Sequence, residues 1–274
     1  MMYCVKIELQ PTSAMTFRVI PGSNLDIATY PFLPPTTMSG YLRRIAMMAA
    51  GEELPKATVE TKEEGAHYYA LPPHLLTTGA IPIGMKGIHK THRKGPSNFK
   101  HFGFSQIYRK KIDKQENIQL HTWEYFFCES MVGFVLAESS EHLVGFKDCE
   151  GWGCKIGKEG YAVVHSVSEP IALQQVRCAA TPSTLLSPES IELEDLYQPI
   201  EFYGLFNYQW SSKSSNMPGG PASTQPSSIE GYIPLSVGNP VSGATFTLDY
   251  LHDGEDIFIA LSWIQALQRG LPKK

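Results

Sequence analysis

Apolar and polar residues alternate over the first ten positions of the chain. Positions 3, 5, 7 and 9 are apolar, and the positions between them include Lys6 and Glu8. A period of two is typical of a β-strand with one buried face. The pattern therefore predicts a strand that ends at Pro11.

A helical repeat follows a proline-containing loop. Positions 38, 41, 42, 45, 46 and 48 or 49 are apolar, which is the spacing of one face of an α-helix. We expect Thr36 or Thr37 to cap this helix, because a threonine hydroxyl can accept from the N–H groups of the first turn. Gly51 is expected to end it.

Short apolar segments recur further along, separated by turn residues. The expected strands are residues 68–71, 123–127, 133–136, 161–167, 202–210 and 245–251, with a short helix at 138–144 and an apolar terminal segment at 257–267. This order of a strand, a helix and further strands predicts an α+β fold with an RRM-like (ferredoxin-like) core and a β-rich C-terminal extension. We expect a single domain over residues 1–274, with a mobile loop at 211–228, where apolar residues are few.

Charge is strongly segregated along the chain. Residues 86–114 hold nine of the 23 lysines and arginines but only one of the 27 acidic residues, Asp113, although the whole chain has a net charge of −4. This basic island has four interleaved aromatic residues (Phe99, Phe102, Phe104 and Tyr108). Cations that pair with phosphates and rings that stack on bases are typical of single-strand binding. The alternative is a solvated basic loop that only improves solubility or contacts an acidic partner.

The flanks of the basic island indicate an insertion. The segments that begin at Ile81 and Ile118 could pair as the stem of a β-hairpin. We therefore expect residues 81–121 to form a basic thumb.

Composition limits the cellular setting. Five widely spaced cysteines without a CxxC motif do not form a disulfide framework, which favours a reducing environment. No apolar run reaches about 18 residues, and no signal-peptide pattern is present. We expect a soluble cytoplasmic protein with no membrane contact.

A glycine-rich segment, Gly151–Gly160, contains Lys155 and Lys158. Glycines permit close backbone approach and lysines attract anions, so the segment could hold a phosphate; a structural turn is the alternative. It lacks the Gly-Lys-Ser/Thr of a Walker loop and the spacing of a dinucleotide fingerprint.

Candidate catalytic and metal-binding residues are sparse. His89 and His92 could join Cys149 and Cys154 as zinc ligands, but the spacings are unspecific and lysines surround the histidines, so we predict no metal and no cofactor. No GxSxG motif is present, and Cys128 lies in an aromatic run that favours an inert thiol. Metal-free RNA cleavage needs no fixed spacing, and five residues could serve it: His89, His92, His101, Tyr108 and Tyr161.

Residues 30–46 resemble the N-terminal signature of the RAMP superfamily of CRISPR-associated proteins. They are similar, more narrowly, to the fifth Cas family of type I Cascade complexes, in which a proline-proline-threonine turn opens the first helix. The family carries a hairpin thumb and a later glycine-rich loop, and the resemblance covers residues 1–50 and 130–170. The chain beyond Leu185 matches no part of this pattern, which favours a divergent subtype such as type I-D.

The resemblance implies a subunit that binds the 5′ handle of the guide RNA (crRNA) and caps the backbone filament in antiviral defence. Its implied partners are crRNA, the backbone and large subunits and, through the complex, target DNA. Two alternatives stay open: a metal-independent endoribonuclease that processes precursor crRNA, and a protein-interaction module with a basic docking arm. We predict no catalytic residues. The predicted RNA-binding residues are Arg43, Arg44, Lys86, Lys90, His92, Arg93, Lys94, Lys100, Arg109, Lys110, Lys111, Lys155 and Lys158.

Overall fold

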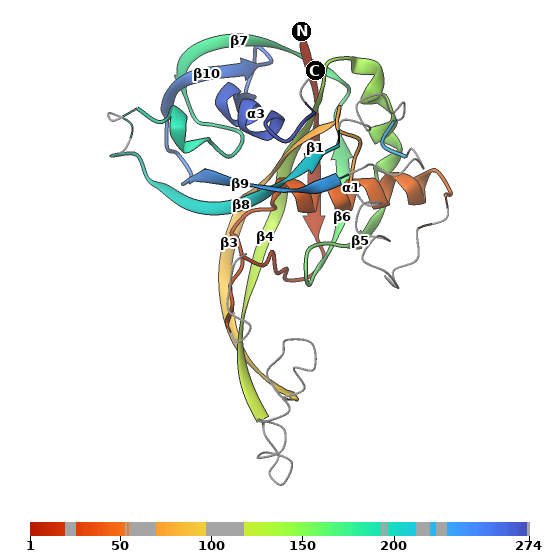
Figure 1. Ribbon diagram of the computed structural model, residues 1–274, viewed down its shortest axis with the longest axis vertical. Coiled ribbons are helices and arrows are strands. Elements are labelled where there is room, and N and C mark those ends of the chain that lie inside the picture. Colours follow the sequence, from red (N-terminus) through yellow and green to blue (C-terminus); the bar gives the residue numbers. More distant parts are fainter. Residues whose placement is uncertain are drawn as a thin grey trace.

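The protein is a sheet-rich α+β structure with few helices (Figure 1). The computed structural model describes residues 1–19, 26–52, 54, 70–96, 118–192, 195, 197–211, 220–222 and 229–272, with backbone alone at 93–96 and 118–121. None of the helices in these ranges is long and apolar enough to cross a membrane.

The described residues form one large sheet of nine strands and a separate two-stranded sheet. The strands are β1 (Met2–Pro11), β2 (Asp26–Ile27), β3 (Leu76–Pro96), β4 (Ile118–Ala137), β5 (Gly153–Lys155), β6 (Tyr161–Val167), β7 (Ile171–Ala180), β8 (Ile200–Trp210), β9 (Ile229–Pro240), β10 (Phe246–His252) and β11 (Phe258–Ala260). The helical elements are α1 (Pro35–Ala49), α3 (Leu261–Gln268) and the 3₁₀ turns η2 (Ser140–His142), η3 (Val144–Cys149) and η4 (Pro188–Ser190).

β1 is the centre of the large sheet. It pairs antiparallel with β4 on one side, while on the other side its two halves pair antiparallel with β6 and β7. β3 adds to β4, and β10 and β11 extend the sheet beyond β7. Leu9, Ile7 and Val5 of β1 are buried in one continuous apolar cluster, so the predicted alternation is confirmed over residues 5–9, whereas Cys4, expected on the other face, is also fully buried.

α1 packs its apolar face on this sheet. Met38, Leu42 and Ile45 are fully buried, as their helical spacing predicts. The helix ends at Ala49, and Gly51 follows with a φ of 69°, a conformation that a residue without a Cβ adopts at no steric cost. The predicted threonine cap is wrong: the N-cap is Pro34, and Pro35 begins the helix without a side-chain cap.

The first turn of α1 is attached to a bulge in β3. Pairing with β4 shifts between Thr77 and Ala80, and Gly79 adopts a φ of 81° there. A Cβ on Gly79 would lie 2.6 Å from the carbonyl oxygen of Leu33. Leu33 and Ala80 exchange both backbone hydrogen bonds, at 2.9 and 3.0 Å, so glycine is what allows this close approach.

β3 and β4 form a long hairpin that projects from the rest of the described elements, toward the lower end of Figure 1. From the sequence we expect Ile81–Gly84 to pair with the segment that begins at Ile118. That register is wrong: Ile81 pairs with Val132, and Pro96 pairs with Ile118. The hairpin is longer than its apolar flanks because the basic residues 86–94 are themselves part of β3.

β8, β9 and α3, from the C-terminal part of the chain, form a second layer over α1 and β3. β8 and β9 pair antiparallel, and the Tyr208 hydroxyl of β8 donates to the carbonyl of Thr36 in α1 at 3.1 Å. The Trp263 indole of α3 donates to the carbonyl of Thr78 in β3 at 3.1 Å. These bonds attach the β-rich extension to the start of α1 and to β3.

Several other expectations can be compared with the structure. β4, β6, β8 and β10 are confirmed as strands, whereas Ala70 and Leu71 of the expected strand 68–71 are not in a strand, and residues 68–69 lie outside the described residues. The expected helix at 138–144 is replaced by the 3₁₀ turns η2 and η3. β7 and β9 were not predicted. Of the predicted mobile loop 211–228, only residues 211 and 220–222 are described.

We expect Gly133→Ala to lower the free energy of unfolding by about 1–3 kcal/mol. A Cβ on Gly133 would collide with the carbonyl oxygen of Gly79 and come within 2.9 Å of the Ala80 Cβ and the end of Met38. Urea denaturation followed by circular dichroism measures the change. Gly204→Ala is the matched control in β8, since nothing lies within 4 Å of its added Cβ. Equal effects of the two substitutions would contradict the close approach.

Candidate nucleic-acid interface

A groove of about 470 Å³ lies at the N-terminal end of α1. One wall is the start of the helix, and the other is the segment Phe17–Arg18 with Gly157 and Lys158. Three cationic side chains line it: Arg18, Arg44 and Lys158. Cations from three separate parts of the chain meet in this groove, which gives it the charge of an anion-binding site.

The helix itself adds to this charge. No side chain caps the first turn of α1 among the described residues. The first N–H groups of a helix have no partner within it and carry a partial positive charge. Thr36 and Thr37 of this turn line the groove together with Gly40. A phosphate in the groove would therefore meet N–H dipoles as well as three side-chain cations.

The glycine-rich segment contributes Lys158 to the groove but does not form the expected backbone cradle. Its N–H groups are largely used within the fold: Gly151 donates to Val164, Ile156 to Gly160 and Lys158 to Thr16, at 2.9–3.0 Å. Residues 153–155 form β5, which pairs with β6. Exposed Lys155 in β5 and exposed Lys158 remain as side-chain candidates.

The two adjacent arginines of α1 have opposite environments. Arg43, predicted as an RNA contact, is 2% exposed and donates from Nη1 to the carbonyl of Pro221 at 3.1 Å, so its side chain has almost no surface to offer RNA. Burial lowers the pKa of its guanidinium, an effect that nearby Glu52 opposes. Arg44 is half-buried, lines the groove and hydrogen-bonds the thiol of Cys154. Adjacent helical positions point about 100° apart, which explains the difference.

The described part of the hairpin has a cationic face. Lys86, Lys90 and His92 alternate along β3 and are exposed. Lys90 is already paired, since its Nζ lies 2.8 Å from Glu124 Oε1, and this hydrogen bond raises the pKa of the lysine. Lys86 and His92 are the other described basic side chains on this face, and His92 Nδ1 lies 3.4 Å from Thr122 Oγ1.

The remaining predicted contacts of the basic island lie at the end of β3 or outside the described residues. Arg93 and Lys94 continue β3, and their backbones pair with His121 and Leu120. The other predicted contacts of the basic island lie outside the described residues: Lys100, Arg109, Lys110 and Lys111. Sequence reasoning missed Arg18, because a single arginine in a loop gives no signal until folding brings it beside Arg44.

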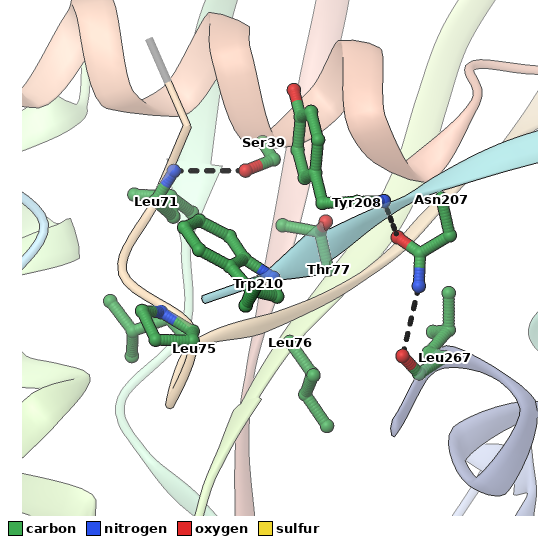
Figure 2. A pocket seen from close by; sticks show the side chains of 10 residues that line it. Ser39, Leu71, Leu75, Leu76, Thr77, Asn207, Tyr208, Trp210 and Leu267 are labelled. Atoms are coloured by element: carbon green, nitrogen blue, oxygen red, sulfur yellow. Dashed lines mark hydrogen bonds between the residues drawn. The ribbon is translucent and has the colours of Figure 1, made fainter. Parts of the chain in front are cut away.

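Figure 2 shows a second, much smaller cavity between α1, β8 and α3. Its volume is about 20 Å³, enough for a single water molecule. Ser39 accepts from the N–H of Leu71 at 2.9 Å, and Asn207 donates to the carbonyl of Leu267 at 2.9 Å. The polar groups at this cavity therefore stabilise the junction of the two layers.

The described residues hold no cluster of three or more histidine, cysteine or acidic side chains that could bind a metal. Burial raises the pKa of the Cys128 thiol to about 12, although Lys86 opposes the shift. The thiol is protonated near neutral pH, which agrees with its prediction as an inert residue.

Comparisons with known proteins give little further identification. No protein-family model matches the chain, and no curated protein matches it. The chain is similar to the crystal structure of a CRISPR protein from Archaeoglobus fulgidus, with 12% sequence identity and a TM-score of 0.43 over 94% of this chain and 99% of that chain. A TM-score of this size does not establish a common fold.

We expect Arg43→Ala to lower the free energy of unfolding by about 2–4 kcal/mol, because it removes a buried guanidinium and leaves the Pro221 carbonyl without its donor. Arg44→Ala should change stability by less than about 1 kcal/mol. Thermal unfolding of the two variants provides the comparison. A larger loss of stability at Arg44 than at Arg43 would overturn the assignment of Arg43 to the interior.

Proposed function

We propose that this protein is an RNA-binding subunit of a type I CRISPR complex, which binds the 5′ handle of the guide RNA and caps the backbone filament. One observation carries the proposal: the segment that resembles the RAMP signature, residues 30–46, also supplies one wall of the cationic groove. Pro34, Thr36, Thr37, Gly40 and Arg44 all belong to both. A sequence resemblance and an independent geometric feature thus coincide at the same residues.

The strand order supports an RRM-like core. β3, β4, β1 and β6 are neighbours in that order, all antiparallel, and α1 lies between β1 and β3 in the sequence. A ferredoxin-like β-α-β-β-α-β unit places its strands in this way. The departure is the second helix, whose place between β4 and β6 is taken by η2 and η3. The β3–β4 hairpin would be the thumb of this core.

Contacts with protein subunits are part of the proposal. The outer face of the β8–β9 sheet exposes three rings, with 54% of Phe202, 39% of Phe206 and 55% of Tyr232 accessible. Exposed aromatic residues on one face favour a protein partner. This surface would contact the backbone or large subunit, while the groove would bind crRNA.

The salt dependence of RNA binding tests the groove. The Arg44→Ala/Lys158→Ala double variant should bind single-stranded RNA more weakly, and the slope of log K against log salt should fall by about 0.7 for each phosphate that the protein no longer neutralises. Fluorescence anisotropy at several salt concentrations measures both quantities. Arg177→Gln is the control, since Arg177 in β7 is exposed but paired with Glu192 and Asp249. An unchanged slope in the double variant argues against the groove.

The corresponding test of the basic island uses Arg109→Ala/Lys110→Ala/Lys111→Ala. We expect this triple variant to bind all RNA sequences more weakly and to the same extent, with a smaller salt slope, because phosphate contacts carry no sequence information. The same anisotropy titrations, made with RNAs of different sequence, measure this effect. A reduction in affinity for one sequence alone would contradict it.

We further propose that the protein does not cut RNA. His89 and His92 lie three residues apart in β3 and so face opposite sides of the hairpin, which argues against a joint acid–base role. Repeat RNA incubated with the purified protein should stay intact with or without chelator. Cleavage that survives chelation and disappears in a variant of His89, His92, His101, Tyr108 or Tyr161 would instead favour the processing endoribonuclease.

A further inference from the structure

Three aromatic residues lie on one face of β4. Trp123, Tyr125 and Phe127 occupy alternate positions of the strand, so their side chains share a face. The rings of Trp123 and Tyr125 are stacked, with centroids 6.4 Å apart and an angle of 21° between their planes. Phe127 is 41% exposed. We call these three residues the ring row.

The facing strand leaves space for these rings. Gly87 of β3 is directly opposite Phe127, and a Cβ on Gly87 would lie 2.6 Å from the tip of the Phe127 ring. The phenyl ring therefore lies across Gly87. Trp123 faces Thr91, another small residue, so the two strands form a surface from which mainly rings project.

Lys158 connects the ring row to the cationic groove. Its Nζ is 5.9 Å from the centroid of the Trp123 ring, and the same residue lines the groove. The next residue, Glu159, accepts a hydrogen bond from the Tyr125 hydroxyl at 3.2 Å. The glycine-rich segment thus contacts the Trp123 end of the ring row and also lines the groove. Lys158 belongs to both surfaces.

A polyanion with flat, apolar side groups fits this arrangement. Proteins that bind single strands combine a positive groove for the backbone with aromatic side chains on which successive bases stack. The ring row is flanked by exposed His89, which pairs with Tyr125 across the hairpin and can also stack or donate to a base. Lys86 projects from the opposite face, so phosphate and base contacts are separated on the hairpin.

We propose that the ring row is a base-stacking site for unpaired RNA whose phosphates enter the cationic groove. This inference rests on the RNA-binding function proposed above and specifies how the RNA is bound. The ring row stacks on the flat faces of bases, and because every base has such a face, this contact tolerates any sequence. At Lys158, the bound RNA would change from phosphate contacts in the groove to base stacking on the ring row.

The test uses two probes of equal length and charge, a single-stranded oligoadenylate and an oligomer with the same backbone but abasic sites. Trp123→Leu and Phe127→Leu keep an apolar side chain but remove the ring. Each should weaken oligoadenylate binding about tenfold, the effect of removing one base–ring stack, and should leave abasic binding and the salt slope unchanged. Tyr232→Leu, on the exposed face of β9, is the control and should alter neither.

The outcomes separate the two proposals. If the unmodified protein binds neither probe, the proposed RNA-binding function fails. If it binds both equally, RNA binding stands and the stacking site is refuted. Equal reductions in affinity for both probes in the leucine variants would also refute stacking, since only a change in the fold of the hairpin explains them.

Fluorescence gives a second measurement that does not depend on the leucine variants. Stacking should quench Trp123 when oligoadenylate binds, and Trp123→Phe, which retains a ring, should abolish this part of the signal from the four tryptophans. Quenching that persists unchanged in Trp123→Phe would contradict the site.

Discussion

The close approach of α1 to the hairpin depends on two glycines. Gly79 in the β3 bulge passes beneath Leu33, and Gly133 in β4 meets the backbone of Gly79, so that no side chain separates the start of the helix from the sheet. The bulge displaces backbone groups from the regular ladder, and the Thr78 hydroxyl accepts from the N–H of Phe134 at 3.0 Å. Trp263 donates to the carbonyl of Thr78. Side chains therefore satisfy backbone groups at the crossing that would otherwise lower its stability.

This crossing fixes the position of the cationic groove. Because α1 begins at the bulge, its uncapped first turn lies beside the root of the projecting hairpin, and Arg44 follows on the next turns. The Thr77 hydroxyl donates to the carbonyl of Pro35 at 2.9 Å, which orients the first turn further. Tyr30 and Phe32, just before the helix, pack edge-on against Tyr203 of β8. The same short segment is thus held by the sheet on one side and by the C-terminal layer on the other.

Elements with a strong period were predictable from the sequence, and elements that depend on partners were not. β1 and α1 carry buried residues at most of the expected positions, because one face of each meets the core, while Tyr3 and Met48 near the ends are only partly buried. β9 alternates between less exposed and exposed residues over 229–237, but it contains Gly231, Pro234 and Gly238, which lower strand propensity, and among the described strands it pairs with β8 alone. The hairpin register was not predictable, since bulges at Gly79 and after Ile83 shift the pairing without any change in apolar pattern.

The candidate site likewise has one part that the sequence predicts and one part that only folding brings together. Charge segregation identifies the basic island, but the count of cations overstates what the described hairpin offers, because Glu124 already neutralises Lys90. Arg18, Arg44 and Lys158 are unremarkable in sequence and become a site only when separate loops and a helix end meet. Within the described part of the hairpin, phosphate attraction would then concentrate at the root, next to the ring row. An RNA strand that is held there by its phosphates keeps its bases free to stack on the ring row. Because phosphate contacts and stacking do not depend on base identity, they strengthen binding without making it specific for sequence.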